Sequence, residues 1–215
     1  MLVRHGETLH NVAGVAQGWG DSELSGRGQQ QVARVAERLK NVGADALFSS
    51  PLQRALTTAQ KISESTGLEI HTLDDLREMN YGRWEGQKFL DVRKVDEEDY
   101  QRWISDDEFA CPEGESHAQV RARIARALGL VAGFSVEAGF SPPFPSGGLK
   151  PASTQKRAIV VTHGTAIRVA VTVLLGLPLS ASRNFAQDNA AINMFNRRGD
   201  HWVLKSWNDH DSRTD

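Results

Sequence analysis

Short apolar runs alternate along the chain with longer segments in which apolar residues recur every three or four positions. A short run predicts a buried strand, and the longer spacing predicts an amphipathic helix. Residues 44–49 contain the run Ala46-Leu47-Phe48 and predict one such strand. The other expected strands lie immediately before His5 and at residues 68–73, 158–162, 191–195 and 202–207. The sum of these elements predicts a three-layer α/β domain.

Start and stop signals give the expected bounds of the helices. Ser25 is a candidate N-cap for a helix that Gly43 ends. Pro51 suits the first turn of the next helix, which Gly67 closes. Further helices are expected around residues 120–131 and at residues 165–175, whereas the polar, glycine-rich residues 11–21 predict a loop.

Two segments interrupt this regular alternation. Between Asp96 and Glu115 the chain has nine acidic residues and one basic residue, Arg102. Such a stretch is most often a solvated face, and the sharper alternative is a lid, which we place at residues 79–115. Residues 134–156 are rich in Pro, Gly and Ser and predict an inserted surface loop. Because the strand pattern resumes directly after that loop, we expect one domain over residues 1–215.

Composition and charge are those of an ordinary globular protein, with 40% hydrophobic and 24% charged residues. The formal net charge of -2 gives no support for nucleic-acid binding, which usually needs a basic surface. The chain lacks an apolar run long enough to cross a bilayer, and its first residues read as a strand and not as a cleaved signal peptide. Cys111 is the only cysteine, which rules out an intrachain disulfide. We therefore expect a cytoplasmic protein that binds neither nucleic acid nor a membrane.

One sequence feature occurs twice, an apolar run that ends in histidine and glycine. Val3-Arg4-His5-Gly6 stands near the start, and Val161-Thr162-His163-Gly164 lies far downstream. The glycine permits a sharp turn at the carboxyl end of a strand, which is the edge of an open α/β sheet where ligands bind. Two imidazoles at one edge, the first beside an arginine, indicate a site that handles a phosphate.

His5 is the candidate nucleophile. A neutral imidazole can attack phosphorus and hold the phosphoryl group as a covalent intermediate. We expect Arg4 to favour the neutral form of His5 through like-charge repulsion. The residues Gly6-Glu7-Thr8 are expected to supply backbone N–H and hydroxyl donors to the phosphate.

The other histidines lack this context. His10, His71, His117 and His201 are expected to be structural. The sequence contains neither a His-Glu-x-x-His helix nor a Cys/His cluster at zinc spacing, so we expect no metal site.

Further residues are candidates for binding the phosphate. Phosphoryl transfer spreads negative charge over three equatorial oxygens and therefore needs several donors. Arg54 follows a strand and falls in the first turn of a helix, where backbone N–H groups and the helix dipole favour anions. The alternative for Arg54 is a surface ion pair of little energetic weight. Together with Arg4, His5 and His163, Arg54 would nearly surround a phosphate.

The leaving group must also receive a proton. Glu78 is the best candidate acid, a role that requires partial burial beside a dianion. The alternative for Glu78 is an ion pair with its neighbour Arg77. Glu85 is the competing carboxylate, and the sequence alone leaves it open.

These motifs, in this order, resemble those of the histidine phosphatase superfamily, also called phosphoglycerate mutase-like. The resemblance rests on Arg4-His5-Gly6-Glu7-Thr8 with Asn11, on Gln17-Gly18, on Ser49-Ser50-Pro51-Leu52-Gln53-Arg54-Ala55, on Glu78 with Trp84-Glu85-Gly86, and on His163-Gly164. It implies a three-layer α/β/α sandwich with a mostly parallel central sheet. It also implies catalytic roles for His5, Glu78, His163, Arg4 and Arg54, with no metal or organic cofactor.

The same resemblance implies which residues contact the substrate. These are Asn11, Gln17, Gly18, Gly164 and Arg83, with Arg83 expected in the wall that selects the leaving group. Mutases of this family usually carry a tandem arginine after the proton-donor loop to clamp a carboxylate. The corresponding stretch, Asp99-Tyr100-Gln101-Arg102-Trp103, has one arginine among acids, and a rim of carboxylates is unsuited to a second anion.

We therefore expect a member of the phosphatase branch that acts on a small phosphorylated metabolite, as a monomer or homodimer. The alternatives are a cofactor-dependent phosphoglycerate mutase and a non-catalytic regulatory protein that binds phosphorylated ligands.

Overall fold

The computed structural model describes residues 1–136 and 156–210. Its strands are β1 (Leu2–Arg4), β2 (Ala46–Ser49), β3 (Ile70–Thr72), β4 (Ala158–Thr162), β5 (Ile192–Arg198) and β6 (His201–Asp209). Its α-helices are α1 (Leu9–Ala13), α2 (Gly26–Leu39), α3 (Gln53–Thr66), α4 (Phe89–Val95), α5 (Glu97–Ser105), α6 (His117–Val136) and α7 (Gly164–Leu175). Short 3-10 segments are η1 (Asp74–Leu76), η2 (Gly82–Trp84) and η3 (Leu179–Asn184).

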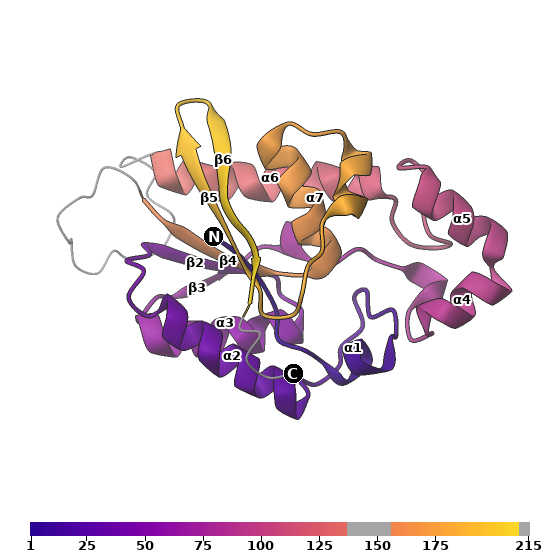
Figure 1. Ribbon diagram of the computed structural model, residues 1–215, viewed down its shortest axis with the longest axis horizontal. Helices are drawn as coiled ribbons and strands as arrows, with labels where there is room; N and C mark the ends of the chain where they lie inside the picture. The colour runs from indigo at the N-terminus through magenta and orange to yellow at the C-terminus, as the bar shows by residue number, and fades with distance from the viewer. Residues whose placement is uncertain (137–155, 211–215) are drawn as a thin grey trace.

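The strands form one sheet in the order β3-β2-β4-β1-β5-β6. The pairs β3–β2, β2–β4 and β4–β1 are parallel, whereas β5 is antiparallel to both β1 and β6. Figure 1 shows α2 and α3 on one side of the sheet and α6 and α7 on the other. The structure therefore confirms the three-layer α/β/α sandwich with a mostly parallel central sheet.

Both faces of the central strands are buried, which explains why their sequences are continuous apolar runs. Val161 and Ile159 pack in one hydrophobic cluster with side chains of α2 and α3. Val160, between them, belongs to a second cluster with side chains of α6 and α7. Successive strand residues point to opposite faces, so a strand covered on both faces has no solvent-facing position for a polar residue.

Part of the predicted loop at residues 11–21 is helical instead. The Thr8 side chain accepts the backbone N–H of Asn11 while the Asn11 side chain accepts the backbone N–H of Thr8, which forms a capping box at the start of α1. Gly14 ends the helix in the left-handed conformation with φ 68°. Paired caps thus stabilise a helix that is too short for hydrophobic periodicity to reveal.

Two predicted helix boundaries are also wrong. Ser25 caps α2 as expected, but the helix ends at Leu39, and Gly43 lies in the connection between α2 and β2. Pro51 precedes α3, which begins at Gln53 and not at the proline. The predicted end of this helix at Gly67 is confirmed, with φ 73°.

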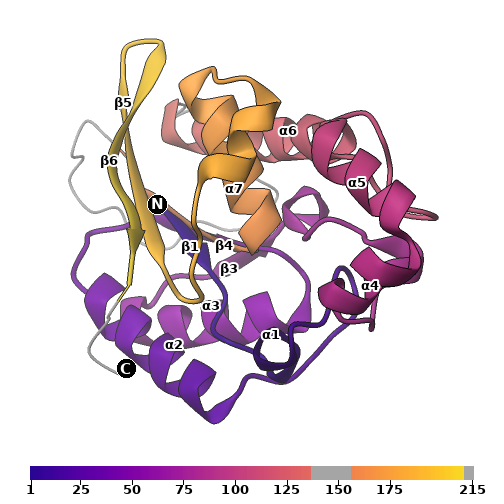
Figure 2. The same ribbon diagram turned by 45° about the vertical axis from the view of Figure 1, so that its right-hand side comes forward.

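The segment predicted as a lid, residues 79–115, contains η2, α4 and α5. In Figure 1 and Figure 2 the two helices lie together at one end of the molecule, away from the β5–β6 hairpin. Aromatic side chains of the segment pack around Trp103, which contacts Phe89 and Tyr100 of the two helices and Tyr81 and Trp84 at η2. Of the predicted surface loop at residues 134–156, residues 134–136 belong to α6 and residues 137–155 lie outside the described residues.

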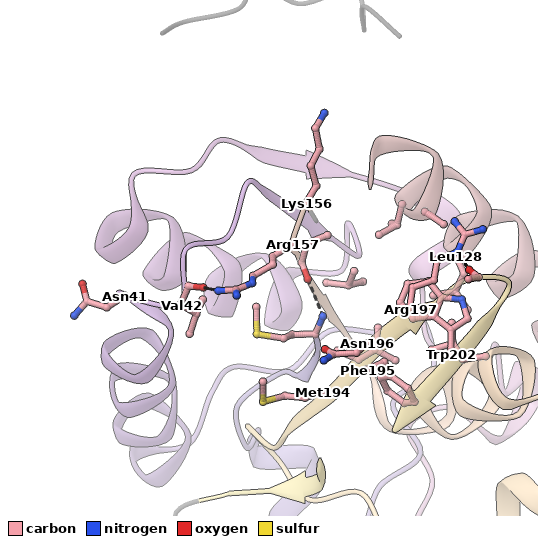
Figure 3. A pocket seen from close by; sticks show the side chains of 18 residues that line it. Asn41, Val42, Leu128, Lys156, Arg157, Met194, Phe195, Asn196, Arg197 and Trp202 are labelled. Atoms are coloured by element: carbon pink, nitrogen blue, oxygen red, sulfur yellow. Dashed lines mark hydrogen bonds between the residues drawn. The ribbon is translucent and has the colours of Figure 1, made fainter. Parts of the chain in front are cut away.

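A cavity of about 720 Å³ lies at the amino-terminal ends of β1 and β4 (Figure 3). Its wall includes Leu2 and Ala158 from the strand starts, Leu128 from α6, and Phe195 and Trp202 from the hairpin. Ligands of open α/β sheets bind at the opposite, carboxyl-terminal edge. In the described part of the chain, no helix is long and apolar enough to cross a membrane.

Gly28 occupies a crowded position in the first turn of α2. A Cβ built at Gly28 would lie 1.9 Å from the backbone oxygen of Glu7, whereas a Cβ at Gly26 would meet nothing within 4 Å. We expect Gly28→Ala to lower the free energy of unfolding by about 1–3 kcal/mol, because the helix and the Glu7 backbone must separate. Urea unfolding measures the change. Gly26→Ala is the matched control and should be neutral or stabilising, and an equal loss in both variants would contradict this account of the contact.

Candidate active site

Two adjacent parallel strands deliver the two predicted histidines to one edge of the sheet. His5 follows β1, and its backbone N–H donates to the Thr162 oxygen at the end of β4. His163 follows β4 and is the N-cap residue of α7. Their ring centroids are 5.2 Å apart, and the residues are 2% and 0% exposed. The structure therefore brings together the pair that the repeated motif predicted.

The hydrogen bond of His5 determines which ring nitrogen is free. Nδ1 lies 2.7 Å from the backbone oxygen of Gly6. A carbonyl oxygen only accepts, so Nδ1 carries the hydrogen and Nε2 keeps its lone pair in the neutral ring. Burial, followed by the charges of Arg54 and Arg4, holds the pKa of His5 well below its ordinary value. The predicted repulsion by Arg4 is confirmed in direction, although burial is the larger cause.

His163 presents its other nitrogen to the same space. Nε2 lies 2.7 Å from the Ser50 hydroxyl, which also accepts the backbone N–H of Leu52. With the Ser50 hydrogen directed at Nε2, the ring carries its own hydrogen on Nδ1. Nδ1 is buried and has no hydrogen-bond partner among the described residues. In that tautomer His163 is a neutral donor at Nδ1, and burial is the main reason that its pKa lies well below the ordinary value.

Two buried arginines flank the histidines. Arg54, the second residue of α3, is 2% exposed and donates to the backbone oxygens of Gly18 and Gly20 at 2.7 Å each. Arg4 donates to the backbone oxygen of Gln187 and packs its guanidinium against Gly164. Burial lowers the pKa of Arg4 to about 10, which leaves it charged at neutral pH. Arg54 does form an ion pair, with Asp21 at 3.7 Å, but its own side chain is buried, so the predicted surface location is wrong.

The Nε atoms of both arginines are buried without a partner among the described residues, as is Nδ1 of His163. A buried donor left unsatisfied costs about 1–3 kcal/mol. Three such donors beside a histidine pair constitute a site that an anion with several oxygens would complete.

Glu78 caps α7, the helix that follows His163. Its carboxylate accepts the backbone N–H groups of Met79 at 2.9 Å and of Thr165 and Ala166 at 3.1 Å each. The predicted alternative, an ion pair with Arg77, is wrong because Arg77 pairs with Asp74. The charge of Glu78 raises the pKa of both Arg4 and Arg54, so the carboxylate faces the two arginines.

Glu85, the competing carboxylate, has a different position. It accepts the backbone N–H groups of Trp19, Gly20 and Tyr81, and so joins the loop after α1 to the loop after Glu78. Glu85 therefore braces two loops, whereas Glu78 lies at the histidine pair.

Arg123 is a buried residue that no sequence motif identified. It donates to both oxygens of Glu115 and to the backbone oxygens of Asp75, Arg77 and Glu78. These bonds tie the Glu78 segment to α6. The chain offers no local signal for this role, because the partners lie between 8 and 48 positions away.

Several predicted phosphate donors are already engaged within the protein. The backbone N–H of Gly6 donates to Thr58 Oγ1, that of Glu7 to Gln31 Oε1 and that of Thr8 to Asn11 Oδ1. The expectation that Gly6-Glu7-Thr8 supply donors to the phosphate is therefore wrong for these three N–H groups. They hold the turn that follows β1.

Of the predicted substrate contacts, four lie beside the histidines and arginines of the site, and Arg83 lies at the surface. The Asn189 side-chain amide donates both to Asn11 Oδ1 and to the backbone oxygen of His5. Gln17 Oε1 accepts the Thr8 hydroxyl. Gly18 binds Arg54 and Gly164 contacts Arg4, as described above. Arg83 is exposed and forms an ion pair with Glu113 at 3.6 Å, so its expected place in the pocket wall has no support in the structure.

Part of the acidic stretch is neutralised within the protein. Asp107 pairs with Arg183, Glu113 with Arg83 and Glu115 with Arg123, and Asp96 accepts the Trp84 indole N–H. The structure therefore weakens the sequence argument that these carboxylates exclude a second anionic group from the site.

A model of the histidine phosphatase superfamily (branch 1) matches residues 1–210. The chain belongs to the histidine phosphatase superfamily. Within this family, the "Probable phosphoglycerate mutase GpmB" of Erwinia tasmaniensis is 33% identical, covering 96% of this chain and 88% of that protein.

Solved structures of named phosphatases share the fold. A mycobacterial glucosyl-3-phosphoglycerate phosphatase in complex with VO3 aligns with a TM-score of 0.82 at 28% identity, covering 96% of each chain. A phosphoserine phosphatase mutant from Entamoeba histolytica, in complex with phosphoserine, aligns with a TM-score of 0.77 at 32% identity, covering 96% of this chain and 94% of that one. The histidine phosphatase superfamily and these relatives support a phosphatase or a mutase.

The buried imidazoles of this superfamily member make its stability depend on pH. Burial lowers the pKa of His5 and His163 well below 6.5 and that of His117 to about 4. In the unfolded chain each histidine has a pKa near 6.5. As the pH falls, the unfolded state therefore binds protons that the folded state does not bind, and acidification favours unfolding. This contribution to stability is complete above about pH 6.5. It decreases below that pH by about 1.4 kcal/mol per pH unit for each imidazole.

Urea unfolding between about pH 7.5 and pH 5.5 measures this slope. His117→Asn should reduce it, and the same change at the exposed His201 should leave it as it is. A free energy of unfolding that stays constant over this range would contradict the burial of neutral imidazoles.

Proposed function

We propose that this protein is a metal-independent phosphatase that hydrolyses phosphate monoesters through a phosphohistidine on His5. The observation that supports the proposal best is the state of the His5 ring. It is buried and neutral, its Nδ1 hydrogen is held by Gly6, and its Nε2 lone pair faces a space shared with His163, Arg4, Arg54 and Glu78.

In the first step His5 Nε2 attacks phosphorus, and the N–P bond forms as the bond from phosphorus to the ester oxygen breaks. Glu78, protonated at this stage, gives its proton to the departing oxygen, so an alcohol leaves. In the second step a water oxygen attacks phosphorus and the N–P bond breaks. The Glu78 carboxylate takes the proton of that water, and inorganic phosphate leaves with the enzyme restored.

The arginines and His163 bind the three oxygens that do not react. Their unpaired buried donors, two Nε atoms and one Nδ1, supply charge and hydrogen bonds where the transition state is most negative. Asn11 and Gln17 line the turn after His5, and Gly18 and Gly164 hold the arginines in place. In this proposal the Glu78 carboxylate, which caps α7, is positioned on the side of the leaving group.

The substrate that we propose is a small phosphorylated metabolite. The names of the relatives include phosphatases for glucosyl-3-phosphoglycerate and phosphoserine, and they support hydrolysis. The name of the Erwinia relative supports a phosphoglycerate mutase as the second candidate. A mutase returns the phosphoryl group to a bound acid instead of passing it to water, through the same histidine.

The two candidates differ in one assay. Purified protein with a metal chelator is given p-nitrophenyl phosphate, and release of inorganic phosphate with a transient, acid-labile phosphoenzyme is the expected result. Conversion of 3-phosphoglycerate to 2-phosphoglycerate with a bisphosphate primer, faster than phosphate release, would establish the mutase instead. Folded protein that shows neither reaction would support the non-catalytic regulatory alternative.

A further inference from the structure

Beside the candidate active site lies Arg168, a cation that pairs with no carboxylate of residues 1–136 and 156–210. It lies on α7, and its Nη2 donates to the Thr165 hydroxyl at 3.0 Å. In the described part of the chain this is its one hydrogen bond, and it forms no ion pair, unlike Arg183, which pairs with Asp107 at 2.7 Å. A partly buried guanidinium with one bond out of five possible N–H donors has capacity for an anion.

The position of Arg168 relates it to the leaving group. Side chains of a helix lean toward its N-terminus, so Arg168 reaches back along α7 toward His163. Thr165 connects it to Glu78, because the Thr165 N–H donates to Glu78 Oε2 while the Thr165 hydroxyl accepts from Arg168. The proton donor of the proposed reaction must touch the leaving oxygen. Arg168 is therefore connected, through Thr165, to the carboxylate that would contact the leaving oxygen.

The charges near the site also indicate that Arg168 acts on the leaving group. In the proposed reaction Arg4 and Arg54 face the phosphate, and Glu78 gives its proton to the leaving group. Arg168 is close enough to Arg4, Tyr81 and His117 to lower the pKa of each, so its field acts inside the site. No carboxylate of the described residues pairs with Arg168, and one negative charge on the leaving group would give it a partner.

We propose that Arg168 is a specificity-determining residue that binds a carboxylate on the leaving group of the substrate. This inference rests on the proposed phosphatase function. It commits to a carboxylate because one unpaired guanidinium matches a single charge on two oxygens, which it can bind through parallel N–H bonds. A phosphate ester of a small hydroxy acid is then the preferred substrate class.

The test compares two substrates that differ at one group. 3-Phosphoglycerate carries a carboxylate where glycerol 3-phosphate carries a hydroxymethyl group, and the ester oxygen is equivalent in both. We expect wild-type kcat/KM to favour 3-phosphoglycerate by about 10–100-fold, the range for one charged hydrogen-bonding pair. In Arg168→Met this ratio should fall to about 1, chiefly through a higher KM for 3-phosphoglycerate. Arg168→Lys keeps the charge and should retain part of the ratio.

Arg183→Met is the matched control, because that arginine already has a carboxylate partner, and its ratio should equal that of the wild type. An equal loss for both substrates in Arg168→Met, with the ratio preserved, would overturn the inference and identify a role in positioning Glu78 through Thr165. Wild-type turnover without preference for 3-phosphoglycerate would overturn the inference alone.

A binding measurement separates this inference from the reaction itself. Calorimetry on His5→Ala protein, which is expected to bind esters without cleaving them, should give a dissociation constant for 3-phosphoglycerate about 10–100-fold below that for glycerol 3-phosphate. If the wild type cleaves neither ester and the His5→Ala protein binds neither, the proposed function fails and the inference fails with it.

Discussion

Replacing His5 with alanine lowers kcat for every phosphate monoester by about 10⁴–10⁶-fold, the range expected when a covalent nucleophile is removed. The loss is the same for aryl and alkyl esters, because both need the same N–P bond. The folded structure should survive the change, since the His5 side chain forms one hydrogen bond, to the adjacent residue. Steady-state kinetics and thermal unfolding on the same preparations measure the two effects.

Trapping the phosphohistidine intermediate tests which ring nitrogen of His5 is the nucleophile. Because Nδ1 is held by Gly6, the phosphoryl group should be found on Nε2 of His5 in base-quenched enzyme, by NMR or by isomer-specific detection. His201→Ala, at an exposed histidine of β6, is the control and should form the intermediate normally. Phosphorylation on Nδ1, or on any other residue, would contradict the geometry that we describe.

Replacing Glu78 with glutamine lowers kcat for alkyl phosphates by about 10³-fold and for p-nitrophenyl phosphate by less than about tenfold. An alkoxide needs a proton as it leaves, whereas p-nitrophenolate is stable without one. The signature is therefore the dependence of the rate on the leaving group, and plots of log kcat against leaving-group pKa should become steeper in the variant.

Glu85→Gln is a matched control, because each of the two carboxylates accepts three backbone N–H groups. Both variants lose comparable capping bonds, so a comparable loss of stability is expected from each. Only Glu78→Gln should change the leaving-group dependence. The same change in Glu85→Gln alone would assign the proton donor to Glu85.

The candidate residues whose positions the sequence predicted are those placed by local structure. His5 and His163 each follow an apolar run, and Arg54 follows a strand by a few residues. The end of a strand and the first turn of a helix are set by neighbouring residues, so a short motif specifies where such a side chain begins. Adjacent parallel strands then bring these ends to one edge.

The predictions that failed concern the use of donors and charges. The N–H groups of Gly6-Glu7-Thr8 are held by Thr58, Gln31 and Asn11, and the first two partners lie on separate helices. Arg83 faces Glu113 at the surface. A motif names the residue that offers a donor, but a partner distant in the chain determines whether that donor is free.

The sequence by itself determined the alternation of strands and helices, the burial of the central sheet and the group of side chains at its carboxyl edge. Hydrophobic spacing and helix caps involve residues that are close in sequence, so the sequence alone indicates these features. Only the tertiary structure decided the free nitrogen of His5, the bracing of the Glu78 segment by Arg123, and the lack of a carboxylate partner for Arg168 among the described residues. Each of these depends on which oxygens and charges surround a side chain, and long-range packing places those groups.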